Sequence, residues 1–303
     1  MSLRDILVCL DPTDSGEARL RLAAGLASEQ HAHLSAACIL PERTADAEIA
    51  EHDGLGFHAP NESAEVAPGS LVAGIPVPDA PPAAKGDYAR RLELTDLLQQ
   101  RFRETLQLDG ISGGDWQLFG EGESDNLLAA ARAADLVIYP QGSVEYRMPT
   151  GFAPEDLILA AGRPILVVPY RTDVTALGRR VLVAWDGSRE AARAAHDALP
   201  LLHSTEHVTV LTVGEREADF ERHRSGLERL RMNYQRHGIA ARAEATIRGD
   251  LAIADLLLSR AADFGADLIV AGAYHHSQLR EALFGGVTRD LLDHMTVPVL
   301  MSR

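Results

Sequence analysis

The sequence is poor in lysine, cysteine and long apolar runs. Lys85 is the only lysine among 29 basic residues, which indicates a biased composition and no particular chemistry. The 303 residues carry a net charge of −15, so the chain would repel nucleic acid and anionic membrane, and we expect neither as a partner. No stretch approaches the roughly 20 apolar residues of a membrane span, and the N-terminus runs into a strand pattern rather than a signal peptide. We therefore expect a soluble cytoplasmic protein.

Cysteine and catalytic motifs are equally scarce. Cys9 and Cys38 lie inside apolar runs typical of strands, outside any CxxC motif or Cys/His cluster, so we expect buried, reduced thiols. The sequence has no HExxH or GxxxxGK[ST] motif and no GxSxG nucleophile elbow at the end of a strand. The glycines of "ISGGDW" (111–116) precede a strand pattern and predict a turn. These absences favour a non-enzymatic protein, with slow ATP hydrolysis as the enzymatic alternative.

What the sequence does contain is an internal repeat. "RDILVCLDPTDSGEARLRLAAGLA" and "RRVLVAWDGSREAARAAHDALPLL" both combine a strand pattern, an aspartate, a polar turn and a helix pattern, and this match pairs Asp11 with Asp186. Further along, "ARAADLVIYP" resembles "ADFGADLIVAG" and pairs Asp135 with Asp267. Each copy ends in an apolar strand pattern with a proline, "RPILVVPY" and "VPVLMSR".

The first copy is longer than the second. Asp11 and Asp135 are 124 positions apart, whereas Asp186 and Asp267 are 81 apart. The extra residues fall between positions 41 and 90, a segment rich in proline and glycine with nine acidic and three basic residues. This composition predicts a long loop with little regular structure, which would be either a solvated insertion or a lid or partner-binding arm.

Short β-branched runs alternate with longer helix patterns, which predicts an α/β fold with helices on both faces of a parallel sheet. We expect domains at 1–171 and 176–303. Such sheets bind ligands beyond the carboxyl ends of their strands, where "LVAWDGS" and "IVAGAYHH" would face one crevice. In the second copy the predicted strands cover 180–185, 207–213, 242–247, 267–271 and 297–301, and the predicted helices cover 188–201, 219–237, 253–264 and 286–294.

The segments "VLVAWDGS" and "GADLIVAGAYHHSQLREALFGGVTRDLLDHMTVPVLM" resemble the universal stress protein (UspA-like) family, and the repeat extends this resemblance to the first copy. It implies two Rossmann-like domains of the adenine-nucleotide alpha-hydrolase-like type, each with a five-stranded parallel sheet. It also implies that the two domains pair through their last strands within one chain. Exposed surfaces leave a homodimer of such tandem chains open.

Some family members bind ATP through a loop G-x2-G-x9-G-[ST], whose glycines let backbone N–H groups approach phosphates. Here Gly272 and Gly285 match the first and third glycines, but His275 replaces the second and Gly286 replaces the hydroxyl residue. Thr288, two positions further on, offers a hydroxyl outside the family's position. The resemblance places the crevice at these residues: Asp186, Val213, Gly272, His275, Gly285, Gly286, Val287 and Thr288.

Three interpretations of this loop stay open. In the first, the histidine in place of glycine blocks binding of the triphosphate. In the second, a protonated His275 or His276 attracts an anion. In the third, the loop binds no ligand and only connects a strand to a helix. The nucleotide candidates are ATP, ADP and AMP, with magnesium only as part of a nucleotide complex. In the first copy, Pro140 and Phe152 take the places of Gly272 and Gly286, which disfavours phosphate binding there.

Other candidate residues have structural alternatives. Asp186 is equally suited to contact an adenosine and to orient its turn, and for Asp11 we expect capping of the following helix. Adjacent His275 and His276 point apart in an extended segment, so with His294 they do not predict a zinc site. Arg280 and Arg289 are expected on solvated helix faces.

Two functions follow from these patterns. The first is a tandem stress-response module with a degenerate nucleotide- or anion-binding crevice in its second domain. The alternative is a stress protein that binds no nucleotide and acts through protein contacts, for which the 41–90 segment would supply recognition; its protein partners are not indicated.

Overall fold

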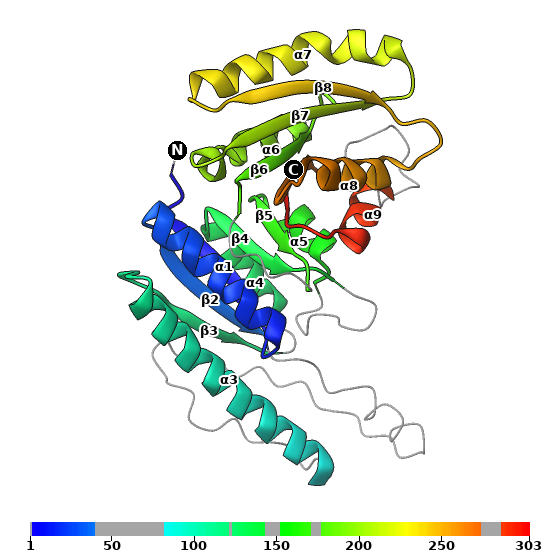
Figure 1. The fold of residues 1–303 in the computed structure, drawn as a ribbon. Helices are drawn as coiled ribbons and strands as arrows, with labels where there is room; N and C mark the ends of the chain where they lie inside the picture. Colours follow the sequence, from blue (N-terminus) through cyan, green and yellow to red (C-terminus); the bar gives the residue numbers. More distant parts are fainter. Residues whose placement is uncertain (1, 40–81, 121–122, 143–151, 171–176, 274–285) are drawn as a thin grey trace, which may run out of the picture.

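The computed structural model describes residues 2–39, 82–120, 123–142, 152–170, 177–273 and 286–303. Two α/β halves follow one another along the chain (Figure 1). The first half contains β1 (Asp5–Leu10), α1 (Asp14–Gln30), β2 (His33–Ile39), α3 (Pro82–Leu108), β3 (Trp116–Phe119), α4 (Ser124–Ala133), β4 (Leu136–Pro140), α5 (Pro154–Ala161) and β5 (Ile165–Val168). The second contains β6 (Arg180–Ala184), α6 (Arg189–Asp197), the 3-10 helix η1 (Leu199–Leu202), β7 (His207–Gly214), α7 (Glu217–Arg236), β8 (Ala241–Ile247), α8 (Ile253–Phe264), β9 (Leu268–Gly272), α9 (Gly286–His294) and β10 (Val299–Ser302).

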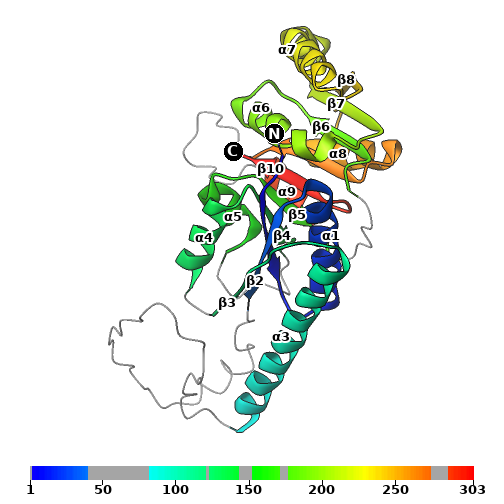
Figure 2. The ribbon, with the colours of Figure 1, turned by 90° about the vertical axis from the view of Figure 1, so that its left-hand side faces the viewer.

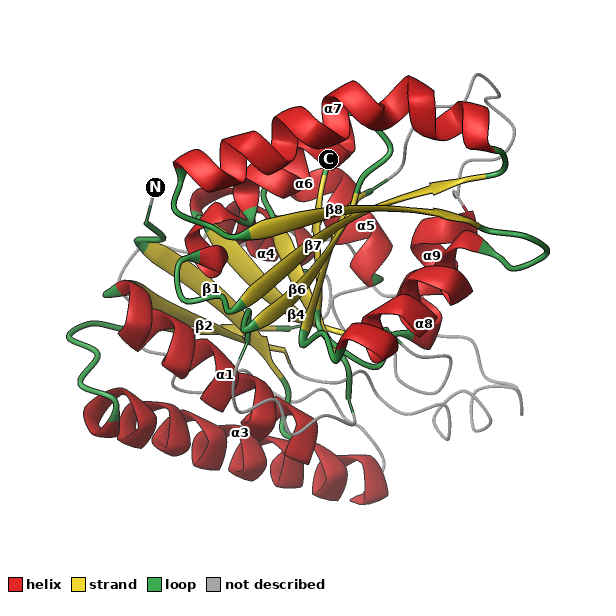
Figure 3. Ribbon diagram, turned by 45° about the horizontal axis from the view of Figure 1, so that its top comes forward, coloured by secondary structure: helices red, strands yellow, loops and turns green. Residues whose placement is uncertain are grey.

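The strands of both halves form one ten-stranded sheet in the order β3-β2-β1-β4-β5-β10-β9-β6-β7-β8. Neighbouring strands within each half are parallel. The halves meet where β5 and β10 pair antiparallel, with Leu166 opposite Leu300. Figure 3 shows the result as a continuous twisted layer of strands. The predicted five-stranded parallel sheets and their pairing through the last strands are therefore confirmed.

Helices cover both faces of this sheet. The alternation along β1 separates the two cores, since Ile6 and Val8 pack in the core that includes α1, α3, α6 and α7. Leu7 and Cys9 pack in the core that includes α4, α5, α8 and α9. On the first face, α3 lies alongside α1 (Figure 2). This arrangement leaves the two ends of the strands as the places where side chains of several elements can meet.

A repeated aspartate fixes the start of each half. Asp135 accepts hydrogen bonds from the backbone N–H groups of Arg4 and Asp5, at 2.8 and 3.2 Å. Asp267 accepts equivalent bonds from the backbone N–H groups at 178, 179 and 180, at 3.0 to 3.2 Å. The pairing of these two aspartates in the sequence repeat therefore reflects a shared structural role.

Helix α3 corrects the predicted extent of the insertion. The loop was expected to reach residue 90, but the helix already begins at Pro82. Proline is well tolerated in the first turn of a helix, so the Pro/Gly-rich composition placed the boundary too far along the chain. Residues 40–81 and 171–176 lie outside the described residues, and the expected domain boundaries stay predictions.

Both cysteines are buried in adjacent strands and form no disulfide, as predicted. Burial raises the pKa of each thiol from 9.0 to about 12. Among the helices that the structure describes, none combines the length and the apolar character needed to cross a membrane.

Candidate functional site

The sequence-predicted site of the second half lies at the carboxyl ends of β6, β7 and β9. Strand β6 lies between β7 and β9, so the chain leaves it toward one side of the sheet and returns on the other. This reversal of strand order is where parallel α/β sheets open a crevice. Asp186 follows β6, Val213 is near the end of β7, and Gly272 ends β9. The structure therefore brings these three predicted residues to the same edge of the sheet.

Asp186 orients the turn that starts α6. Its Oδ1 atom accepts a hydrogen bond from the backbone N–H of Ser188 at 2.9 Å. Ser188 in turn caps the helix, because its hydroxyl accepts from the backbone N–H of Ala191 at 3.0 Å. Asp186 is exposed, and its Oδ2 atom has no hydrogen-bond partner in the part of the chain that the structure describes. The turn therefore uses one carboxylate oxygen and leaves the other accessible.

Gly272 lets the first turn of α6 pack directly on the end of β9. A Cβ atom at this position would lie 2.5 Å from the carbonyl carbon of Glu190 and closer still to the backbone nitrogen of Ala191. Real Cβ atoms do not approach backbone atoms so closely, so only glycine fits. The match of Gly272 to the family's first glycine thus coincides with a close backbone contact beside the crevice.

Helix α9 begins at Gly286, and its first turn supplies backbone N–H groups of the kind that bind anions. Val287 is 39% exposed, whereas Thr288 is buried. A carboxylate stands near this end of the crevice, since Asp290 Oδ2 lies 3.7 Å from the position a Cβ of Gly286 would take. The backbone of Glu190 lies against Gly272, and its buried side chain pairs with Arg189 at 2.5 Å. The negative charge of Asp290 opposes a highly charged ligand.

The loop between β9 and α9 cannot be compared with its prediction. His275, His276, Arg280 and Gly285 lie outside the described residues. Arg289 was expected on a solvated helix face, and this is confirmed: its side chain is exposed, with Nε 3.7 Å from Asp293 Oδ2. His294 Nδ1 is 2.9 Å from the carbonyl oxygen of Asp290. Within the described ranges, no three His, Cys, Asp or Glu side chains are grouped as metal ligands would be.

The first half fills the equivalent place with its own side chains. Strand register gives Pro140 the same position in the first half that Gly272 has in the second, as the sequence comparison predicted. The fully buried Arg19 guanidinium donates through Nη2 to Asp11 Oδ2 and through Nε to the carbonyl oxygen of Cys9, the latter at 2.8 Å. The repeat places Ala194 where the first half has Arg19. A buried ion pair therefore occupies the first half, where the second half has only a small side chain.

The expectation that Asp11 caps α1 is wrong. Thr13 is the N-cap, and its hydroxyl accepts from the backbone N–H of Gly16 at 3.2 Å. Asp11 is only 1% exposed and is engaged by Arg19, because a buried guanidinium requires a carboxylate. The signal was present in the sequence: Arg19 falls on the same helix face as Ala23 and Leu26, among apolar residues.

Comparison with known proteins agrees with this architecture. The Universal stress protein family model matches residues 178–303. The second half is a universal stress protein domain. The structure of the whole chain is similar to a universal stress protein from Archaeoglobus fulgidus, with a TM-score of 0.63 and 13% identity over 98% of this chain and 96% of that chain. The comparison with curated proteins gave no match.

Two Pseudomonas aeruginosa structures resemble this chain over both halves. A putative universal stress protein from strain UCBPP-PA14 gives a TM-score of 0.54 and 17% identity, over 99% of this chain and 93% of that chain. A functionally unknown protein from strain PAO1 gives 0.52 and 17%, over 99% and 92%. At these identities the likeness concerns the fold, which extends over both halves of the chain.

Proposed function

We propose that this universal stress protein is a non-enzymatic stress-response module whose second domain binds an adenine nucleotide or another anion. The observation that carries the proposal is the contact at Gly272, where a glycine admits the first turn of α6 to the end of β9. The accessible Oδ2 atom of Asp186 and the N-terminus of α9 supply an acceptor and anion-binding N–H groups at the same edge. The first domain has Pro140 and the Asp11–Arg19 pair there and serves as a structural partner.

The charge of the crevice supports a ligand with few phosphates. Asp290 stands near the end where phosphates would lie, and the chain as a whole carries a charge of −15. We therefore expect AMP to bind at least as well as ATP. Magnesium would enter only with a nucleotide, where it would reduce the repulsion of the triphosphate.

A thermal-shift titration with ATP, ADP and AMP, with and without magnesium, tests this proposal. A ligand that binds only the folded state raises the unfolding midpoint as its concentration rises. We expect such a rise, and we expect Asp186→Ala to reduce it. Release of phosphate from ATP, measured in parallel, would contradict the non-enzymatic part of the proposal if Asp186→Ala also abolished it.

The alternative function, a stress protein that acts through protein contacts, is supported by apolar side chains on α3. Leu94 and Leu97 are 40% and 46% exposed, one turn apart on this helix. Absence of a midpoint shift with any of the three nucleotides up to millimolar concentration would favour this alternative. Cytoplasmic location and the lack of nucleic-acid partners remain predictions from the charge of the chain.

A further inference from the structure

The amino ends of the strands, opposite the crevice, carry a polar cluster in each half. In the first half, Asp5 and His33 are paired in the register of β1 and β2, and Asp115 immediately precedes β3. His33 Nδ1 lies 3.8 Å from Asp5 Oδ1, and His33 Nε2 lies 3.6 Å from Asp115 Oδ2. Ser35 Oγ is 3.3 Å from His33 Nδ1. Side chains from three adjacent strands thus converge on one imidazole ring.

The second half has the same positions with the opposite charge. Strand register pairs Arg180 with His207 and Thr209 with Arg242. In the repeat, His207 replaces His33 and Thr209 replaces Ser35, so the histidine and the hydroxyl are kept. Both flanking aspartates have become arginines, Arg180 for Asp5 and Arg242 for Asp115. The first cluster places two carboxylates around a histidine, whereas the second places two cations around one.

Nearby carboxylates do not neutralise these two arginines. Glu206 pairs with Arg179, and Glu228 pairs with Arg231. Glu244 lies on the same face of β8 as Arg242, two residues along, but forms no ion pair with it. Within the described residues, neither Arg180 nor Arg242 has an ion-pair partner, although the chain carries a net charge of −15. An unneutralised pair of arginines in so acidic a protein indicates an anionic ligand.

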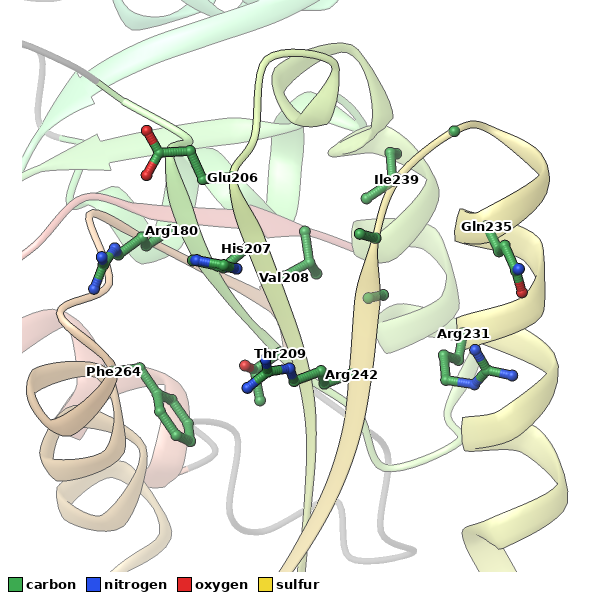
Figure 4. Close-up of a pocket in the computed structure, with 13 residues that line it drawn as sticks. Arg180, Glu206, His207, Val208, Thr209, Arg231, Gln235, Ile239, Arg242 and Phe264 are labelled. Carbon is green, nitrogen blue, oxygen red and sulfur yellow. The ribbon is translucent and has the colours of Figure 1, made fainter.

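The second cluster lines a hollow of about 740 Å³, large enough for a small organic molecule. Figure 4 shows Thr209 and Arg242 side by side above β7 and β8, with Phe264 of α8 across from them. Arg180 Nη1 lies 3.6 Å from the position a Cβ of Gly265 would take, which places its guanidinium at the C-terminus of α8. That helix end favours a cation such as Arg180.

We propose that this hollow binds a small molecule that carries a dianionic phosphate group. Arg180 and Arg242 line the hollow from two strands, and Thr209 offers a hydroxyl beside Arg242, so the donors come from three adjacent strands. A phosphate has enough oxygens to accept from all of them, whereas one carboxylate would satisfy a single guanidinium fork. The volume beyond the phosphate, next to Phe264, accommodates an apolar or aromatic remainder. This site is separate from the crevice at the carboxyl ends and does not depend on nucleotide binding there.

Phenyl phosphate is a suitable probe, because it joins a phosphate to an aromatic ring and lacks adenosine. We expect a saturable change of its ³¹P resonance on titration with the full-length protein at low ionic strength. Arg180→Gln and Arg242→Gln should each weaken binding by about tenfold or more, since each removes a charged hydrogen-bond donor. Arg103→Gln on α3 removes the same charge from an exposed site of the first half and should leave binding unchanged.

Asp186→Ala separates this site from the crevice and should also leave phenyl phosphate binding unchanged. Circular dichroism of each variant shows that a loss of binding does not arise from unfolding. The proposal is overturned if the titration does not saturate, or if Arg103→Gln weakens binding as much as Arg180→Gln and Arg242→Gln do. It is also overturned if Asp186→Ala abolishes the binding of phenyl phosphate.

Discussion

Gln141 Nε2 donates a hydrogen bond of 2.7 Å to the carbonyl oxygen of Leu292, and this bond joins the two halves of the protein. A second bond, of 3.2 Å, reaches the carbonyl oxygen of Asp293. Gln141 directly follows β4 of the first half, whereas both acceptors lie in the last turn of α9. Because α9 begins at Gly286, beside the crevice of the second half, a residue of the first half positions a helix of the second site.

Replacement of Gln141 by leucine should destabilise the protein by about 1–3 kcal/mol, because carbonyl groups at the end of α9 lose a buried donor. Urea unfolding followed by circular dichroism measures this change. Gln107→Leu on the exposed face of α3 is the matched control and should change stability by less than about 0.5 kcal/mol. Equal effects of the two substitutions would show that the Gln141 bonds do not contribute.

The buried Asp11–Arg19 pair should be sensitive to the loss of one partner. Arg19→Met leaves the Asp11 carboxylate buried without a cation and should cost about 3–5 kcal/mol. The double variant Asp11→Asn/Arg19→Met removes both charges and should recover part of that loss. Arg193→Met breaks an exposed pair with Asp197 on α6 and should cost less than about 1 kcal/mol.

Unfolding free energies of the unsubstituted protein, Asp11→Asn, Arg19→Met and the double variant form a double-mutant cycle for this pair, with Arg193→Met as the surface control. A double variant less stable than Arg19→Met alone would contradict the account of a buried pair that depends on mutual compensation.

The repeat made the fold predictable, because strand and helix patterns recur with the same aspartates in both copies. The predicted helices 253–264 and 286–294 coincide with α8 and α9. Long-range side-chain contacts were not predictable in the same way. Gln141 reaches a helix more than 150 positions away, and no local pattern marks such a bond. The buried Arg19 was overlooked because arginine on a helix usually indicates a solvated position.

The same distinction applies to the candidate site. The spacing of the glycines pointed to Gly272, because a position where two backbones touch requires a glycine, and the glycine is visible in the sequence. The distance between the Asp290 carboxylate and Gly286 depends on the side-chain geometry of α9. The spacing of glycines in the sequence gives no information about that distance.

Two glycine-to-alanine substitutions should have opposite effects on stability. Gly272→Ala places a Cβ against the backbone of α6 and should destabilise the protein by about 1–3 kcal/mol, as other overpacking changes do. Gly25→Ala on the exposed face of α1 meets no atom within 4 Å and should stabilise by about 0.5–1 kcal/mol, because alanine favours a helix. Thermal unfolding of both variants checks the pair, and a neutral Gly272→Ala would refute the close contact.

The thiols should be unreactive in the folded protein. Burial raises the pKa of Cys9 and Cys38 from 9.0 to about 12, so both stay neutral at pH 8, and the thiolate is the reactive form. A thiol-specific reagent at pH 8 should label neither cysteine until urea is added. The raised pKa also has a consequence for stability: above pH 9 the unfolded chain loses these protons while the folded chain keeps them, so stability falls as pH rises from 9 toward 12. Rapid labelling without urea would contradict burial of the two side chains.

The central claim is that the second domain alone keeps a binding crevice, and calorimetric titration of the full-length protein with AMP tests it most directly. The titration is made on Arg242→Gln, so that the hollow at the amino ends of the strands does not contribute. The account predicts one nucleotide per chain in this variant, with binding lost when Asp186→Ala is added. Two nucleotides per chain in Arg242→Gln would contradict the claim that the Asp11–Arg19 pair fills the first domain. Absence of binding up to millimolar AMP, or binding that the added Asp186→Ala leaves intact, would contradict the assignment of the crevice.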